Sequence, residues 1–452
     1  MSERKLILLS PYRLPTDTTL YLGDEEVAAI LNGHQALWHP AVLSLASSLP
    51  RIAPPYDHEE PVANAIYALP DNPPLMLAED WAERAKAAGA LVFTATADRE
   101  ATFENLRDAL HKAKHERHLD LPPEKVRPFL GVGFGHAVLD ALFEAMSHEN
   151  VLPTDDLLQD LRAAIEHIDD AEAWLPHVQS AADRLLAARE VVYPVTLYIV
   201  DLFLLDAEWL DGESLDPTAS GRPVNVLAAA GLLERLANQH PERFAALRER
   251  VGADLAEVIG CGYAEREEPL LPLESQLWNL LKGQAVYREL LGREARVYAR
   301  RRFGFHPQTP LLLQNTGFTH ALLVAFDDGQ LPSYQSAVVG WPSHNGKQVD
   351  AFTRTPQPAD SPQTYFHLAH HLHQTIMQDQ SATLALVHKG QAAPAWYGDW
   401  LELTRLAPVL GRWVTLSSYF GEVMAGDYTS AASPDELSRR RLPQRAHGQH
   451  IP

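Results

Sequence analysis

The stretch RRFGFHPQTPLLLQNTGF, residues 301–318, has the layout of a strand-to-helix connection in an α/β protein. A short strand leads into it, a Phe-Gly turn follows, and an apolar helix that starts at a proline ends at Gly317. Residues in such connections lie at the edge of the sheet where α/β enzymes keep their chemistry. Arg301, Arg302 and His306 are therefore candidate substrate-binding residues.

The same alternation continues on both sides of this stretch. Short apolar runs predict strands, and segments with helical spacing predict the helices between them. The strand candidates are 5–9, 90–98, 191–206, 295–301, 320–329 and 381–390. The helix candidates include 25–46, 102–119, 225–251, 274–292, 361–379 and 396–420. Strands that alternate with helices of this length indicate βαβ units around a parallel sheet.

The composition narrows the class of protein. The chain has 452 residues, a formal net charge of -21 and a single cysteine, Cys261. An acidic surface argues against a nucleic-acid or anionic-membrane binder, because both partners require basic patches. One cysteine excludes an internal disulfide and a Cys-rich zinc module. The N-terminal apolar run LILLS is too short for a secretory leader, so we expect a cytoplasmic protein.

Two motifs suggest ligands but have simpler interpretations. GVGFGH, residues 131–136, resembles a phosphate loop, but it lacks the G-x-G-x-x-G spacing and a preceding strand. A tight turn that lets a helix pack closely is the better interpretation.

HLAHHLH, residues 367–373, places His367 and His371 one helical turn apart, where they could share a metal ion. The alternative is a helix face that carries solvated or core imidazoles.

Several carboxylates and one long loop are candidates for a site. Asp327 and Asp328 follow an apolar strand, where barrels place catalytic acids, although an Asp-Gly turn also explains them. Glu274 precedes a helix, which the helix dipole alone would favour. The loop 340–364 has an Asn-Gly hairpin signal and the composition of a surface that binds sugars or other small polar ligands. A surface hairpin is the alternative. This loop contributes Trp341, Asp350 and Arg354.

The opening stretch resembles a segment of family 38 glycoside hydrolases, the α-mannosidases. The residues in register are Phe303, Gly304, Pro310, Leu312, Leu313, Gly317 and Phe318. WPSHNGKQVDA, residues 341–351, is similar to a second segment of that family, with Asn345 where Asp is usual. The resemblance implies a helix-rich, seven-stranded β/α barrel of the glycoside hydrolase/deacetylase type over residues 1–435. Residues 436–452 are basic and have no apolar periodicity, so we expect a disordered tail. One interpretation of this change in composition is a frameshifted or truncated end.

The resemblance also implies a zinc ion and a retaining mechanism with a nucleophilic Asp and a second carboxylic acid. In this chain Arg301 occupies the nucleophile position and Arg302 the position after it. An arginine stays protonated and has no lone pair for a metal. No zinc site and no cofactor are therefore evident from the sequence.

Two hypotheses follow. The first is a rearranged hydrolase that uses candidate catalytic acids among Asp327, Asp328, Asp350 and Glu274. The second is a non-catalytic barrel that binds a glycan or an anion through Arg301, Arg302 and Arg354. Convergence of two carboxylates on one pocket at the carboxyl ends of the strands would favour the first, and an arginine-lined pocket without such a pair would favour the second. The sequence leaves the sugar and the oligomeric state open.

Overall fold

A computed structural model of the chain describes most residues between Glu3 and Val423. The described residues are 3–16, 22–71, 76–146, 151–170, 172–206, 221–302, 304–324, 326, 334, 336–378, 382–390 and 393–423. The chain divides into two compact units. The N-terminal unit comprises Met1–Thr196, Ser361–Gln374 and Ala393–Arg412, and the C-terminal unit comprises Leu197–Asp360, Thr375–Ala392 and Trp413–Pro452.

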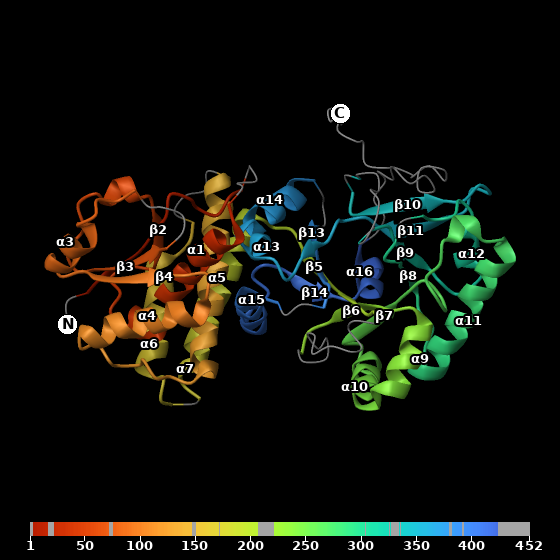
Figure 1. The fold of residues 1–452 in the computed structure, drawn as a ribbon, viewed down its shortest axis with the longest axis horizontal. Coiled ribbons are helices and arrows are strands. Elements are labelled where there is room, and N and C mark those ends of the chain that lie inside the picture. Colours follow the sequence, from red (N-terminus) through yellow and green to blue (C-terminus); the bar gives the residue numbers. More distant parts are fainter. Residues whose placement is uncertain are drawn as a thin grey trace, which may run out of the picture. The chain divides into compact units, whose positions relative to one another are not determined.

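The N-terminal unit is built on a parallel sheet with the order β2-β1-β3-β4 (Figure 1). Its strands are β1 (Lys5–Leu9), β2 (Arg51–Ala53), β3 (Ala65–Pro70) and β4 (Leu91–Ala95). Its helices are α1 (Asp24–Leu37), α2 (Pro40–Leu43), the 3-10 helix η1 (Pro55–His58), α3 (Trp81–Ala87), α4 (Arg99–Lys112), α5 (Pro123–Ala145), α6 (Thr154–Glu166), α7 (Trp174–Val192), α13 (Pro362–Phe366) and α15 (Ala395–Leu406). The helix α14 (Leu368–Gln378) crosses the division between the units.

Alternation along β1 explains why both faces of this sheet are covered. Ile7 and Leu9 point to the face that packs against α3, in a cluster with Trp81. Leu8 points to the opposite face, where it contacts α1 so closely that a Cβ on Gly33 would lie 2.9 Å from it. The sequence predicts one barrel over residues 1–435, whereas β1–β4 pair only with one another in the described part of the chain.

The GVGFGH motif lies inside α5, so the predicted turn is wrong, while the predicted close packing is confirmed. A Cβ on Gly133 would lie 2.3 Å from the Trp38 ring, and a Cβ on Gly131 would lie 2.8 Å from the backbone of Leu403. In the described part of the chain, α5 is the one helix long and apolar enough to cross a membrane, and 89% of its most apolar window is buried inside the protein. Such burial is what a core helix of a soluble protein shows.

The C-terminal unit carries two sheets. The first has the order β12-β13-β5-β6-β7, with β14 paired to β5, and the second has the order β10-β11-β9-β8. The strands are β5 (Leu197–Leu204), β6 (Val224–Leu227), β7 (Ala256–Ile259), β8 (Val297–Tyr298), β9 (His320–Leu322), β10 (Val338–Pro342), β11 (Gln348–Phe352), β12 (Gln357–Pro358), β13 (Ala382–His388) and β14 (Arg412–Val414). The helices are α9 (Ala230–Gln239), α10 (Pro241–Gly252), the 3-10 helix η2 (Glu268–Leu270), α11 (Leu273–Leu291), α12 (Thr309–Gln314) and α16 (Leu416–Glu422).

A parallel bridge between Gly260 and Tyr298 joins the two sheets at β7 and β8. The described strand pairs do not close on themselves, so the predicted α/β class with parallel sheets is confirmed but a closed seven-stranded barrel is not. Along β8, Val297 packs into a cluster with α16, and Tyr298 packs into the cluster that contains α9, α10 and α11. This alternation places side chains of neighbouring residues on opposite faces of the sheet.

Two local predictions are corrected and one is confirmed. Residues 225–251 read as one helix, but their first residues form β6, which is buried in the sheet, before α9 and α10 begin. The strand predicted over 295–301 is limited to β8. The Asn-Gly signal is confirmed, because β10 and β11 pair in antiparallel fashion and Gly346 adopts a φ of 79° in the turn between them.

Candidate functional site

A pocket lies at the carboxyl ends of β5, β6, β7 and β8. These strands run parallel, so the residues that follow them meet at one edge of the sheet, where α/β proteins bind ligands. The pocket has a volume of about 570 Å³, within the range of about 300–1,000 Å³ for small-molecule sites. Its polar lining is Asp206, Arg235, Tyr263, Glu265, Arg301 and Arg302.

Two acid–base contacts organise this lining. Arg301 Nη1 lies 2.6 Å from Asp206 Oδ2, and both side chains are about three-quarters buried. The backbone N–H of Arg302 donates to Glu265 Oε1 at 2.6 Å, and the Glu265 carboxylate is also largely buried. Both carboxylates therefore hold residues of the connection after β8 in place. Asp206 lies next to the guanidinium of Arg301, and Glu265 lies next to Arg302, whose side chain is exposed.

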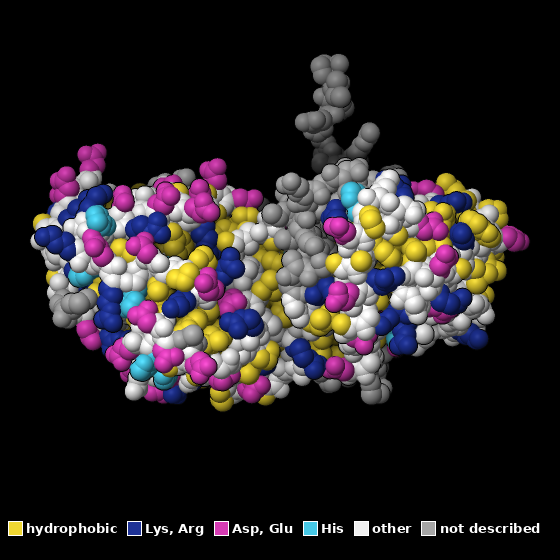
Figure 2. Space-filling model, turned by 90° about the horizontal axis from the view of Figure 1, so that it is seen from below, with side chains coloured by type: hydrophobic (Ala, Val, Ile, Leu, Met, Phe, Trp, Pro, Cys, Tyr) yellow, Lys and Arg dark blue, Asp and Glu magenta, His cyan; other side chains and the backbone are white. Residues whose placement is uncertain are grey.

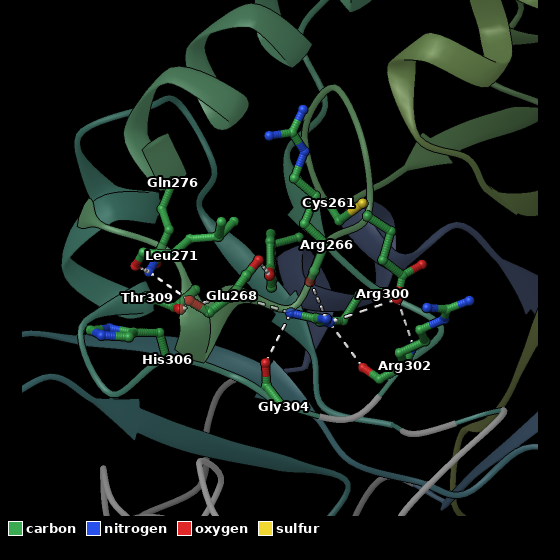
Figure 3. A network of polar contacts seen from close by, with 12 residues as sticks. Cys261, Arg266, Glu268, Leu271, Gln276, Arg300, Arg302, Gly304, His306 and Thr309 are labelled. Carbon is green, nitrogen blue, oxygen red and sulfur yellow. Dashed lines mark hydrogen bonds and ion pairs between the residues drawn. The ribbon is translucent and has the colours of Figure 1, made fainter. Parts of the chain in front are cut away.

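Behind these pocket-lining residues lies a buried network centred on Arg300 (Figure 3). Arg300 is fully buried, and its guanidinium donates to the backbone carbonyls of Arg302 at 2.9 Å, Gly304 at 2.9 Å and Arg266 at 2.8 Å. It also lies 3.3 Å from Glu268 Oε2. The guanidinium thus ties the connection after β7 to the connection after β8, and it fixes the backbone that carries Arg301 and Arg302.

Glu268 is the buried acid of this network. Tyr298 donates a short hydrogen bond to its Oε1, and Thr309 Oγ1 donates to its Oε2 at 3.3 Å. Burial raises the pKa of Glu268, and the Arg300 guanidinium together with these two hydrogen bonds offsets that rise only in part. Glu268 does not line the pocket, so its contacts assign it to the support of the site.

The predicted catalytic acids do not gather at this pocket. Glu274 is exposed in the first turn of α11, as the dipole interpretation expects. Asp350 lies on β11 in register with His320, the first residue of β9, and it is not part of the pocket lining. Asp327 and Asp328 lie outside the residues that the structure describes.

The predicted binding residues are divided among several environments. Arg301 and Arg302 line the pocket. Trp341 is fully buried, with its ring 5.3 Å from that of Phe305 in the core, so it presents no surface to a ligand. His306 accepts from the backbone N–H of Gln308 at 3.2 Å, and Arg354 is half-buried after β11; neither contributes to the pocket lining.

Within the described part of the chain, the residues do not fit a zinc ion. Among the residues that the structure describes, no three His, Cys, Asp or Glu side chains group closely enough to hold a metal. The rings of His367 and His371 are 6.4 Å apart, and burial, together with the charges of His370 and His367, lowers the pKa of His371 to about 4. At the position that the resemblance gives to the nucleophilic Asp, Arg301 instead supplies a permanent positive charge.

Sequence reasoning missed Asp206 and Arg300, and it noted Glu265 only within AEREE, residues 264–268, as one of several carboxylates that a following helix would favour. Asp206 comes directly after the apolar run that contains β5, and Glu265 follows the glycine turn after β7, so the position of each after a parallel strand was a usable signal. Arg300 lies two residues after Tyr298, and side chains two residues apart along a strand point to the same face. The position of Arg300 therefore indicates that its side chain points to the face covered by helices.

Comparison with known proteins finds one family model that is similar to this region. Residues 226–402 match the model described as "Glycosyl hydrolases family 38 N-terminal domain". This part of the chain is similar to that domain, consistent with a divergent relative of it. The family 38 match includes Arg235, Tyr263, Glu265, Arg301 and Arg302 of the pocket, whereas Asp206 precedes it. No curated protein matches the sequence.

Solved structures with detectable similarity are distant. An alpha-mannosidase from Enterococcus faecalis V583 is 15% identical, with a TM-score of 0.41 over 50% of this chain and 29% of its own. A 4-alpha-glucanotransferase from Thermococcus litoralis is 16% identical, with a TM-score of 0.39 over 51% and 41%. A putative polysaccharide deacetylase from Mycobacterium smegmatis is 15% identical, with a TM-score of 0.37 over 55% and 94%. The chain thus spans less than half the length of the first two.

Proposed function

We propose that the pocket at the carboxyl ends of β5–β8 binds a carbohydrate. The observation that carries this proposal is the convergence of two carboxylates and three guanidinium side chains on one cavity of about 570 Å³. Carboxylates accept hydrogen bonds from sugar hydroxyls, and guanidinium groups donate to them. The family 38 match over residues 226–402 supports a carbohydrate as the ligand class.

The proposal favours binding over the α-mannosidase reaction. The retaining reaction needs a carboxylate nucleophile, and Arg301 stands at the position to which the resemblance assigns it. Arg301 is held by Asp206 at 2.6 Å, so its charge is fixed within the lining. A fixed guanidinium beside a carboxylate orients a polar ligand but forms no covalent intermediate with it.

Hydrolysis is the second candidate, because Asp206 and Glu265 line the same pocket. Two carboxyl groups on opposite sides of a glycosidic bond are the usual requirement of glycoside hydrolysis. In this version Asp206 and Glu265 replace the acids to which the sequence pointed.

Binding and turnover are measured on the same full-length proteins. Titration calorimetry with methyl α-mannoside and methyl β-glucoside tests binding, and release of nitrophenol from the matching aryl glycosides, with and without zinc, tests hydrolysis. We expect Asp206→Asn to weaken binding of the preferred sugar at least tenfold, because the lost charge releases Arg301. Asp254→Asn, which removes an exposed partner of Arg293, is the matched control and should bind normally.

Three outcomes of these measurements separate the binder, the hydrolase and the failure of both. Sugar binding that Asp206→Asn weakens, without turnover by the wild type, supports the binder. Turnover that both Asp206→Asn and Glu265→Gln abolish supports the hydrolase. No binding and no turnover across the panel would overturn the proposal.

We also propose a cytoplasmic location and no nucleic-acid partner, and the net charge of -21 supports the second of these. On the face drawn in Figure 2, acidic and basic side chains are interspersed, with apolar side chains between them. This mixture of charges gives the face in view no focus for a polyanion. Retention of the protein on a heparin column at physiological salt would count against this assignment.

A further inference from the structure

Tyr263 belongs both to the pocket and to an aromatic pair that extends away from it. It lines the pocket, and its ring lies 6.1 Å from that of Trp278 on α11, at an interplanar angle of 72°. The Lys282 ammonium lies 5.3 Å from the centre of the Tyr263 ring. Trp278 is 52% exposed, so a large part of its indole surface faces solvent.

The loop that carries Tyr263 is fixed to α11. Asn279 accepts from the backbone N–H of Ala264 at 2.9 Å and donates to the carbonyls of Cys261 and Ala264 at 3.2 and 3.0 Å. The Tyr263 backbone donates to the Asn279 carbonyl at 2.9 Å. The two rings are therefore mounted on one rigid support, and ordering them for a ligand costs little conformational entropy.

Close packing against α11 reinforces that support. At Gly283 a Cβ would lie 2.3 Å from the Gly262 carbonyl carbon and 2.6 Å from the Tyr263 nitrogen. The helix can approach the loop this closely only because residue 283 has no side chain. The position of Trp278 beside Tyr263 follows from that contact.

We propose that the carbohydrate ligand is an oligosaccharide, and that Trp278 forms a stacking subsite for the sugar units beyond the pocket. This inference rests on the proposed function of the pocket. A sugar ring presents a face of C–H bonds that packs on a flat apolar ring, and an indole offers the largest such face among side chains. Tyr263 joins the polar pocket to this subsite, so one chain can occupy both.

The decisive comparison is between one sugar unit and several. Wild-type protein is titrated with methyl α-mannoside and α-mannotriose, and with methyl β-glucoside and cellotriose, and tryptophan fluorescence is recorded alongside calorimetry. We expect the preferred trisaccharide to bind at least tenfold more tightly than its monosaccharide. Trp278→Ala should remove about tenfold of the trisaccharide affinity, as truncation of an aromatic anchor typically does, and leave monosaccharide affinity unchanged.

Two further variants complete the design. Trp278→Phe keeps an aromatic face and should retain most of the trisaccharide affinity. Tyr56→Ala removes an exposed aromatic side chain of the N-terminal unit and should have no effect. Equal affinity for both ligand lengths in the wild type, or trisaccharide affinity that survives Trp278→Ala, overturns the subsite while the pocket proposal stands. Failure of every sugar to bind the wild type overturns both.

Discussion

Arg300→Met tests whether the buried guanidinium holds the wall of the pocket together. The methionine side chain keeps most of the apolar stem and removes every donor. Three backbone carbonyls, those of Arg266, Arg302 and Gly304, lose their hydrogen bonds, and Glu268 loses its cation. Arg300 has no surface exposure, so water does not reach the vacated position without local rearrangement.

The structure sets the size of the effect. A hydrogen bond to a charged group contributes about 1.5–3 kcal/mol, so the three bonds at 2.8–2.9 Å give an upper limit of about 9 kcal/mol. The bonds to the carbonyls of Arg266 and Arg302 are only partly buried, and water replaces some of their contribution. Removal of one partner of a buried ion pair costs about 3–5 kcal/mol. We therefore expect Arg300→Met to destabilise this part of the C-terminal unit by about 4 kcal/mol.

Amide hydrogen exchange measured by mass spectrometry reads this change locally, which suits a chain with two compact units. Peptides that contain β7 and β8 should exchange about 1,000-fold faster in the variant, since each 1.4 kcal/mol is a factor of ten. Arg300→Met combined with Glu268→Gln should recover at least about 1 kcal/mol, because no buried charge is left unpaired. Arg302→Met, which changes an exposed side chain, is the control. Exchange in Arg300→Met within threefold of wild type would refute the reasoning.

Three further predictions concern the C-terminal unit. Burial alone would raise the pKa of Asp201, but His388 and a neighbouring guanidinium outweigh it and hold that pKa below the ordinary 3.8. Asp201→Asn should therefore cost about 3 kcal/mol at pH 7 in urea unfolding. The wild type should lose this extra free energy of unfolding as pH falls below 3.8 and through the lowered pKa of Asp201. A difference in unfolding free energy between wild type and Asp201→Asn that stays constant from pH 7 to 2 would contradict this prediction. Burial raises the pKa of Glu257, so its favourable contribution is complete below the ordinary 4.5 and is lost as pH rises through the raised pKa. The stability of Glu257→Gln relative to wild type should consequently improve from pH 4 to 8, and a flat difference would argue against burial as the cause. Gly283→Ala places a methyl group against the Gly262 backbone and should destabilise by about 2 kcal/mol, as thermal unfolding would show; an unchanged or higher Tm would mean that the helix and loop can separate freely.

The sequence predicted the class of the fold because that class depends on local periodicity. The alternation of apolar runs with helical segments predicted the parallel strands β4, β5 and β13, and the Asn-Gly dipeptide predicted the hairpin between β10 and β11. The division into two units depends instead on which strands pair over long sequence distances. Nothing in the run KLILL indicates whether β1 joins β5 or, as in the structure, β3.

The site was predicted in part for the same reason. Arg301 and Arg302 were found because they follow a predicted strand in a segment that resembles a known family. Asp206 and Glu265 follow strands too, but only their meeting at one edge distinguishes them from the other acidic residues of the chain. Trp341 was predicted to bind a ligand because an aromatic residue near an Asn-Gly turn fits a binding loop as well as a core position, and only its burial separates the two.

Arg300 also has a consequence for how this pocket can change. Its guanidinium binds main-chain carbonyls, and carbonyl groups persist whatever side chains their residues carry. The contacts of Arg300 with the loops after β7 and β8 therefore persist when the outward side chains at positions 301 and 302 are exchanged. Libraries that randomise these two positions and keep Glu265, Glu268 and Arg300 should yield folded proteins with altered ligand preference.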